Sequence, residues 1–154
     1  MKKVKHFLAI VLLVNTGFAW AEVAQAEKKI DIVVNRSPTC SCCGKWVEHL
    51  KQNNFNVKDV VSDDMQSIKN KYGVTQELAS CHTALVNGYV VEGHVPTNDI
   101  RTLLKNKPEV VGITVPGMPS GTPGMEMGGK KDAYQVISFD KKNQQQVFNS
   151  YQAE

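Results

Sequence analysis

Three of the four cysteines in the chain lie within four consecutive residues, at Cys40, Cys42 and Cys43. Thiolate sulfur is a soft ligand for Cu(I) and zinc, and it is also the species that attacks a disulfide. Cys40 and Cys43 have the Cys-x-x-Cys spacing that occurs in both redox and metal sites. The cluster therefore predicts either a site for a soft metal or a redox site that uses Cys40 and Cys43.

The fourth cysteine, Cys81, is followed directly by His82, and His94 comes later in the same segment. Between them, Asn87 and Gly88 separate two apolar runs, which strongly indicates a β-hairpin. Because the open ends of a hairpin lie together, we expect Cys81 and His82 to lie near His94. Imidazole nitrogen also binds copper and zinc, so these three residues are candidate metal ligands.

Methionine is concentrated in residues 112–129, a stretch rich in glycine and proline that we expect to be an irregular loop. It contains three of the five methionines, Met118, Met125 and Met127. Thioether sulfur suits Cu(I), so these residues are also candidate ligands, although a loop that merely covers the site would account for them equally well. His49, on the predicted helix after the cysteines, is expected to be a surface residue. The candidate ligands are soft rather than carboxylate-rich, which favours copper over a hard cation.

The first 26 residues have the pattern of a secretory signal peptide. Three lysines precede a short apolar run at residues 7–14, and two small-x-small sequences follow, ending at Ala21 and Ala26. The apolar run is too short to span a bilayer. We therefore expect cleavage after residue 21 or 26 and a single periplasmic domain, residues 27–154, with no membrane segment in the mature form.

The charge balance argues against a nucleic-acid partner. The chain has 18 Lys and Arg residues against 15 Asp and Glu, a formal net charge of +3. Three of those lysines lie before Ala21, so the exported chain is close to neutral. A basic surface for nucleic acid is therefore not predicted.

Four cysteines in an exported protein ordinarily suggest two structural disulfides. The spacing here argues against that assignment, because the adjacent Cys42 and Cys43 cannot easily bond each other. Only Cys81 lies outside the turn, so two bridges from the turn to distant cysteines cannot be drawn. One reversible disulfide remains, either Cys40–Cys43 or a bridge from Cys81 to the turn, and it would have to be reduced before metal binds.

The three clustered cysteines are expected at a turn between a strand and a helix. Within residues 29–35, Ile30, Ile32 and Val34 occupy alternate positions. Pro38 then interrupts the run, and the residues after it follow helical spacing at Trp46, Val47 and Leu50. The free N–H groups at the start of such a helix favour thiolate over thiol.

The later elements complete an α/β pattern. We expect a strand at 56–62, a short helix at 65–72 capped by Asp63 or Ser62, the hairpin, a helix that begins near Pro96, a strand at 134–139 and a terminal helix at 144–151. This order predicts an α/β sandwich with a small mixed sheet. The Cys-x-x-Cys at the first strand-to-helix turn suggests a thioredoxin-like fold.

Four motifs together resemble the CopG-type periplasmic copper-resistance proteins, a family long catalogued as a domain of unknown function. They are Ser-Pro-Thr-Cys-Ser-Cys-Cys-Gly-Lys-Trp at 37–46, Ser-Cys-His-Thr-Ala at 80–84, Glu-Gly-His-Val-Pro at 92–96 and Val-Pro-Gly-Met-Pro at 115–119. The resemblance covers essentially the whole exported chain. It implies a thioredoxin-like fold, a Cys-x-Cys-Cys copper site joined by Cys81 and His82, and a role in copper resistance. Interconversion of Cu(I) and Cu(II), as proposed for the family, is also implied.

Residue chemistry and resemblance thus agree on a periplasmic protein that holds Cu(I) on cysteine thiolates with histidine and methionine support. Adjacent Cys42 and Cys43 point in different directions, so the thiolates are expected to bridge more than one Cu(I). The expected partners are copper ions and, beyond them, other periplasmic copper-handling proteins or an electron donor.

Two alternative functions remain open. One is a thiol–disulfide oxidoreductase that uses Cys40 and Cys43. It is disfavoured because His82 precedes Thr83 where thioredoxins have a cis-proline. The other is a structural zinc domain held by the four cysteines, although its paired Cys-x-x-Cys knuckles are missing.

Overall fold

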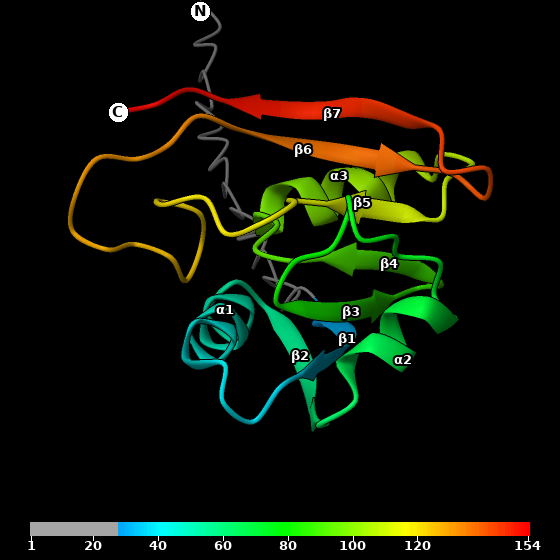
Figure 1. Ribbon diagram of the computed structural model, residues 1–154, viewed down its shortest axis with the longest axis horizontal. Helices are drawn as coiled ribbons and strands as arrows, with labels where there is room; N and C mark the ends of the chain where they lie inside the picture. Colours follow the sequence, from blue (N-terminus) through cyan, green and yellow to red (C-terminus); the bar gives the residue numbers. More distant parts are fainter. Residues whose placement is uncertain (1–27) are drawn as a thin grey trace, which may run out of the picture.

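A seven-stranded mixed sheet forms the centre of the computed structural model, which describes residues 28–154 (Figure 1). The strand order is β2-β1-β3-β4-β5-β6-β7. In chain order the elements are β1 (Ile30–Arg36), α1 (Ser41–Gln52), β2 (Phe55–Val61), α2 (Met65–Lys71), β3 (His82–Val86), β4 (Tyr89–Glu92), α3 (Thr97–Asn106), β5 (Gly112–Thr114), β6 (Tyr134–Phe139) and β7 (Gln145–Tyr151). The predicted signal peptide and its cleavage sites lie outside the described residues.

The pairing of the first four strands sets the position of the site. β1 runs parallel to β2 and antiparallel to β3, and β3 and β4 form an antiparallel hairpin. In its turn, Asn87 and Gly88 have φ values of 46° and 86°, the positive values that a tight hairpin turn requires. The predicted hairpin and the predicted α/β class with a mixed sheet are therefore confirmed, and the arrangement is consistent with a thioredoxin-like fold.

The helices pack against both faces of the sheet. On one face α1 and α3 share a buried cluster, to which they contribute Trp46, Val47, Leu50, Ile100 and Leu103. On the other face, the segment that follows α2 packs against the sheet, and the buried residues are Val74, Leu78, Val90 and Phe139. Figure 1 shows α3 behind the sheet and α2 in front of it.

The predicted terminal helix at 144–151 is wrong, because this segment forms β7 and pairs with β6. Asp140 accepts hydrogen bonds from the backbone N–H groups of Lys142 and Gln144, which closes the turn between the two strands. The rings of Tyr134 and Tyr151 then stack across the strands, with centroids 4.6 Å apart. This cross-strand pair outweighs the weak helical preference of the glutamine-rich start of the segment.

Two smaller expectations are also corrected. Residues 112–114 were expected to be irregular but form β5, which pairs with β4 and β6. The cap of α2 is Asp64 rather than Asp63 or Ser62, because its carboxylate accepts the N–H of Ser67. The sheet is consequently larger than the small sheet that we expected.

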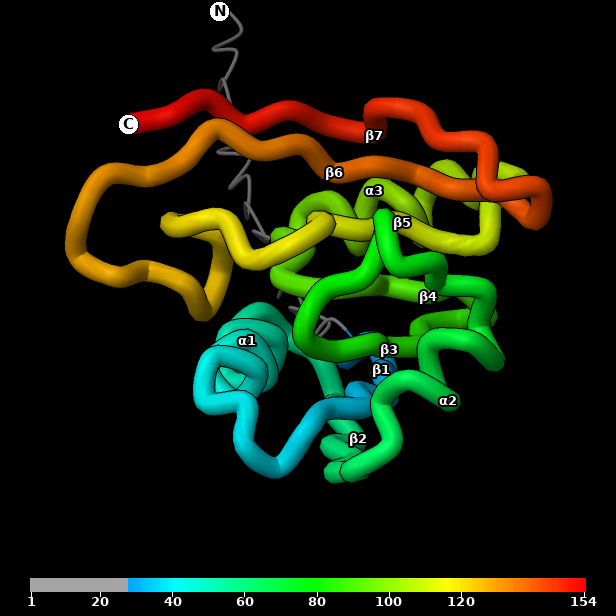
Figure 2. The backbone as a smooth tube through the Cα atoms, viewed as in Figure 1, coloured from blue at the N-terminus to red at the C-terminus, as the bar shows by residue number. Residues whose placement is uncertain are grey.

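A long loop, residues 115–133, follows β5 and reaches α1 before the chain returns to β6 (Figure 2). At Gly124 (φ +84°) the loop lies so close to α1 that an added Cβ would be 2.8 Å from the Trp46 backbone nitrogen. This loop contains Met118, Met125 and Met127 and therefore covers part of the helix that carries the clustered cysteines.

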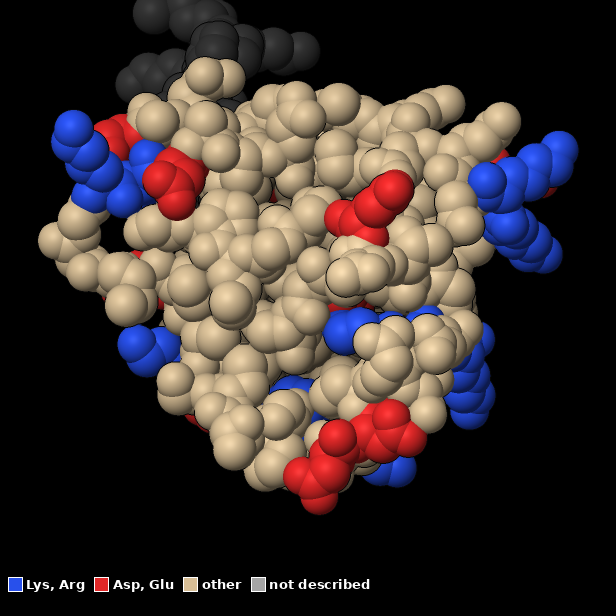
Figure 3. Space-filling view, in the orientation of Figure 1, with Lys and Arg blue, Asp and Glu red and all other residues tan. Residues whose placement is uncertain are grey.

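The described surface has a mixed charge. Lys and Arg side chains are interspersed with Asp and Glu on the face shown in Figure 3. Within residues 28–154, none of the helices combines the length and the apolar character needed to cross a bilayer.

Candidate metal centre

The pairing of β1 with β3 brings the two segments that contain the cysteines to the same end of the sheet. Arg36, the last residue of β1, is the antiparallel partner of His82, the first residue of β3. The chain therefore turns into α1 next to the point where Cys81 enters β3. As a result, the sulfur atoms of all four cysteines lie within 4.8 Å of one another: Cys40, Cys42, Cys43 and Cys81.

The start of α1 positions three of these sulfur atoms. Cys40 is the N-cap residue, with extended backbone at φ −85° and ψ 94°, and Cys42 and Cys43 lie in the first helical turn. Cys43 is fully buried, whereas Cys42 is half-buried. The sulfur atoms of Cys40 and Cys42 are 3.4 Å apart. The predicted placement of the cluster at the helix N-terminus is therefore correct.

A disulfide joins Cys40 to Cys43, and Cys42 and Cys81 are free thiols. Of the two pairings that the sequence left open, the structure has the Cys-x-x-Cys bridge. Two of the four cysteines are thus unable to bind metal as thiolates until the bridge is reduced.

We expect two free thiols per chain in air-exposed, metal-free protein and four after reduction. The measurement is alkylation under denaturing conditions, followed by mass spectrometry of the peptides. Alkylation confined to Cys42 and Cys81 before reduction is the expected pattern. Four reactive thiols in the untreated sample would contradict it.

The Cys81 sulfur lies between two imidazole rings. It is 3.2 Å from Nδ1 of His82 and 3.1 Å from Nε2 of His94. The two rings meet edge to face, with centroids 4.9 Å apart, and both histidines are fully buried. Cys81, His82 and His94 form a second group whose ligand atoms lie within 4.8 Å, so Cys81 belongs to both groups.

Hydrogen bonding fixes the tautomer of His94. Its Nδ1 lies 2.7 Å from the carbonyl oxygen of Pro123, which can only accept, so Nδ1 carries the proton. The lone pair of Nε2 is then directed at the Cys81 sulfur. A backbone carbonyl that orients a histidine in this way is a common feature of metal sites.

His82 has one satisfied nitrogen and one that is buried without a hydrogen-bond partner among the described residues, Nε2. Its other nitrogen, Nδ1, is the one within hydrogen-bond distance of the Cys81 sulfur. The Gly93 backbone acts on the ring in the opposite sense to burial, because a hydrogen bond with it raises the pKa of His82.

Burial favours the neutral forms of all three side chains. It raises the pKa of the Cys81 thiol to about 12, and the nearby Cys42 adds to the rise. It lowers the pKa of His82 well below its ordinary value and also lowers that of His94. At neutral pH the metal-free centre therefore holds a protonated thiol between two uncharged rings.

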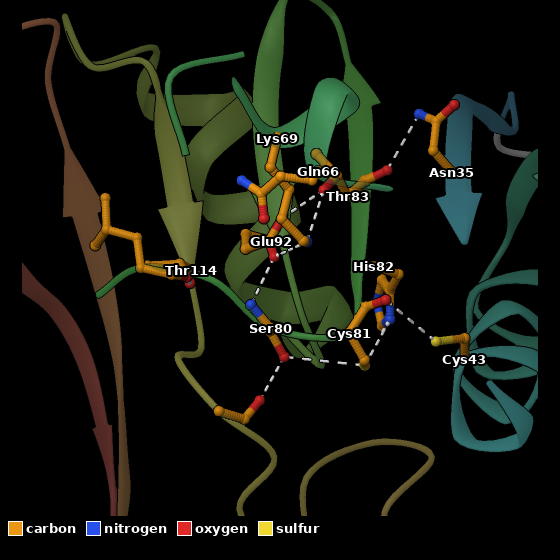
Figure 4. A network of polar contacts seen from close by, with 12 residues as sticks. Asn35, Cys43, Gln66, Lys69, Ser80, Cys81, His82, Thr83, Glu92 and Thr114 are labelled. Carbon is orange, nitrogen blue, oxygen red and sulfur yellow. Dashed lines mark hydrogen bonds and ion pairs between the residues drawn. The ribbon is translucent and has the colours of Figure 1, made fainter. Parts of the chain in front are cut away.

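Sequence reasoning missed several residues that shape this centre. The Trp46 ring packs against His82 with centroids 4.3 Å apart, and its Nε1–H donates to the carbonyl of Val95. Behind Cys81, a buried network joins Lys69, Thr83, Ser80 and Glu92 (Figure 4). The sequence offers one signal for it, an acidic residue directly after the apolar strand positions Val90 and Val91, which marks a candidate buried carboxylate but not its partners.

The methionines are not gathered as tightly as the cysteines and histidines. The side chains of Met118 and Met127 are 56% and 72% exposed. Met125 is half-buried, in a turn where its N–H donates to Thr122 and its carbonyl accepts from Gly121. His49 is half-buried rather than a surface residue, and burial lowers its pKa.

Known proteins with similar sequences and structures include copper-resistance proteins. Residues 78–125 match the family described as "Protein of unknown function, DUF411". No curated protein matches the chain. Two solved structures described as "Copper resistance protein copG", forms 1 and 2, are each 44% identical to it, with a TM-score of 0.77. The matches cover 80% and 81% of this chain and 99% of the solved chains. The chain therefore belongs to the CopG family of copper-resistance proteins.

Proposed function

We propose that this protein binds Cu(I) in the periplasm and thereby contributes to copper resistance. The observation that carries the proposal is the convergence of four cysteine sulfur atoms within 4.8 Å, from two segments that are far apart in the sequence. Thiolates suit Cu(I) better than they suit the hard cations. The relatives described as copper-resistance proteins support the same metal.

The two ligand groups favour a site for more than one copper ion. Cys40, Cys42 and Cys43 would supply thiolates within 4.8 Å of the Cys81 sulfur, and His82 and His94 would supply imidazoles within the same distance of it. Because Cys81 is common to both groups, we infer that its sulfur bridges ions bound by the two groups. Met118, Met125 and Met127 are proposed as supporting ligands from the loop that covers α1.

The proposal includes a redox function as a copper oxidoreductase, which the Cys40–Cys43 disulfide supports. Reduction of the Cys40–Cys43 bridge takes up two electrons and yields two thiolates, and closing the bridge returns the two electrons. Those electrons suffice to reduce two Cu(II) ions to Cu(I). Cys40 and Cys43 are therefore the redox residues in this proposal, with a periplasmic electron donor or copper itself as the partner.

The test is an anaerobic titration of reduced protein with Cu(I) in competition with a chromophoric chelator, followed by X-ray absorption. We expect more than one Cu(I) per chain, copper–sulfur distances and copper–copper scattering. Preferential retention of zinc would favour a structural zinc domain. The same disulfide also supports a thiol–disulfide oxidoreductase, so rapid reduction of insulin without copper retention would favour that function instead.

We also propose that the protein is exported to the periplasm. A single domain begins at residue 22 or 27 after removal of the signal peptide. The mass of protein isolated from the periplasm should match one of these two starts. A mass that includes Met1 would contradict export by this route.

A further inference from the structure

Glu92 is a fully buried carboxylate directly behind the metal centre (Figure 4). Its Oε1 accepts hydrogen bonds from Nζ of Lys69 at 2.5 Å and from the N–H of Ser80 at 2.6 Å. Its Oε2 accepts the hydroxyl of Thr83 at 2.7 Å, and Lys69 also donates to that hydroxyl at 3.1 Å. Both carboxylate oxygens are therefore held by donors from α2, β3 and the segment before β3.

A buried ion pair of this kind is a poor means of stabilising a fold. Desolvation of the two charges offsets most of their attraction, and apolar side chains of similar size often serve as well or better. Lys69 and Glu92 are 7% and 0% exposed, so the desolvation is nearly complete. The ion pair instead holds a neighbouring part of the backbone in position, because Glu92 Oε1 also accepts the N–H of Ser80.

Ser80 is the residue that precedes Cys81, and it is held from three sides. Its N–H binds Glu92, and its hydroxyl donates to the carbonyl of Gly117. It also packs on Gly93, where an added Cβ would lie 2.5 Å from the Ser80 hydroxyl oxygen. The N–H of Gly117 returns a hydrogen bond to the carbonyl of Ala79, at 3.2 Å. The chain entering Cys81 is thus fixed to β4 and to the start of the methionine-containing loop.

Cys81 depends on this anchoring more than the other cysteines do. Cys42 and Cys43 lie within α1, and Cys40 is its N-cap, so helix geometry positions their sulfur atoms. Cys81 lies one residue before β3 and has no helix to orient it. A shift of the Ser80–Cys81 backbone would move its sulfur away from both the α1 cysteines and the two histidines.

We propose that Glu92, held in place by Lys69 and Thr83, is a positioning residue that sets the Cys81 sulfur between the two ligand groups. The proposal deepens the proposed copper function and rests on it for the role of the site. The positioning itself is a property of the metal-free protein. It can therefore be measured whether or not copper binds.

The experiment compares Glu92→Gln and Thr83→Val with the parent protein and with Glu109→Gln, which makes the same change at an exposed glutamate. Glu92→Gln removes the charge that holds Lys69, whereas Thr83→Val removes one donor and leaves the ion pair in place. Circular dichroism and urea unfolding show which variants fold. If Glu92→Gln does not fold, Thr83→Val decides the question.

The first measurement is the alkylation rate of Cys81 relative to that of Cys42 in folded, metal-free protein with its disulfide intact. We expect the ratio to rise several-fold in Glu92→Gln, to rise less in Thr83→Val, and to stay at the parent value in Glu109→Gln. General loosening of the fold would raise both rates together. An unchanged ratio in folded variants, or rates that rise in step, would overturn the proposal.

The second measurement is Cu(I) affinity of the reduced proteins against a chelator. Outer-shell substitutions typically weaken metal binding about 10- to 100-fold, and we expect a loss in this range for Glu92→Gln. Parent affinity in a variant whose Cys81 has become more reactive would overturn the link to copper. If the parent itself binds no Cu(I), the proposed function fails, and the alkylation ratio still tests the positioning role.

Discussion

Cys81→Ser should abolish tight Cu(I) binding while leaving the fold intact. Cys81 is the residue that both ligand groups share, so its loss removes one thiolate from the sulfur group and the only thiolate from the histidine group. A serine hydroxyl is a hard, protonated oxygen and does not replace a soft thiolate. The expected loss of affinity exceeds about 100-fold, above the range typical of outer-shell substitutions.

The measurement is competition for Cu(I) between the reduced variant and a chelator of known affinity. Ser41→Ala provides a matched control, because Ser41 is exposed and lies between two of the clustered cysteines. Unfolding in urea should give nearly the same free energy for the parent and for both variants. Parent-like Cu(I) affinity in Cys81→Ser would show that Cys81 is not a ligand shared by the two groups.

Gly93→Ala should lower the free energy of unfolding by about 2–5 kcal/mol. Gly93 has φ +74°, and the left-handed region costs an alanine about 1–2 kcal/mol. The added Cβ would also lie 2.6 Å from the carbonyl oxygen of Val115 and 2.5 Å from the hydroxyl oxygen of Ser80. Overpacking of this kind adds about 1–3 kcal/mol, because a backbone carbonyl cannot easily move aside.

Gly88→Ala separates these two contributions. Gly88 has φ +86°, but an added Cβ would meet nothing within 4 Å. Its loss of stability, measured by the same urea titrations, should be confined to the conformational cost of about 1–2 kcal/mol. Equal losses in the two variants would show that the contact between Gly93 and Ser80 is not tight.

The sequence predicted the local geometry of the centre well. The Cys-x-x-Cys spacing and the following helical pattern placed Cys40, Cys42 and Cys43 correctly, since both depend on neighbours within a few residues. The Asn87-Gly88 turn likewise brought Cys81 and His94 to one end of a hairpin. Each of these features follows from short-range stereochemistry, which a single sequence expresses directly.

The features that were missed depend on distant partners. β7 is a strand because it pairs with β6, and β5 has only three residues and is defined by its two neighbours. The Lys69–Glu92 pair joins residues 23 positions apart, and the carbonyl of Pro123 orients His94 from 29 positions away. Local propensity contains no information about such contacts, so neither the network nor the tautomer was predictable.

Under the proposed copper function, the buried thiol of Cys81 should make copper binding depend on pH. With a pKa of about 12, Cys81 is protonated at every physiological pH, so binding as a thiolate must release its proton. Each released proton makes the apparent affinity fall about tenfold for each unit by which the pH drops, so Cys81 alone contributes a slope of that size. Competition titrations at several pH values measure this slope. The affinity for copper would thus fall as the compartment becomes acidic, so that copper dissociates, and it would rise as the compartment becomes alkaline.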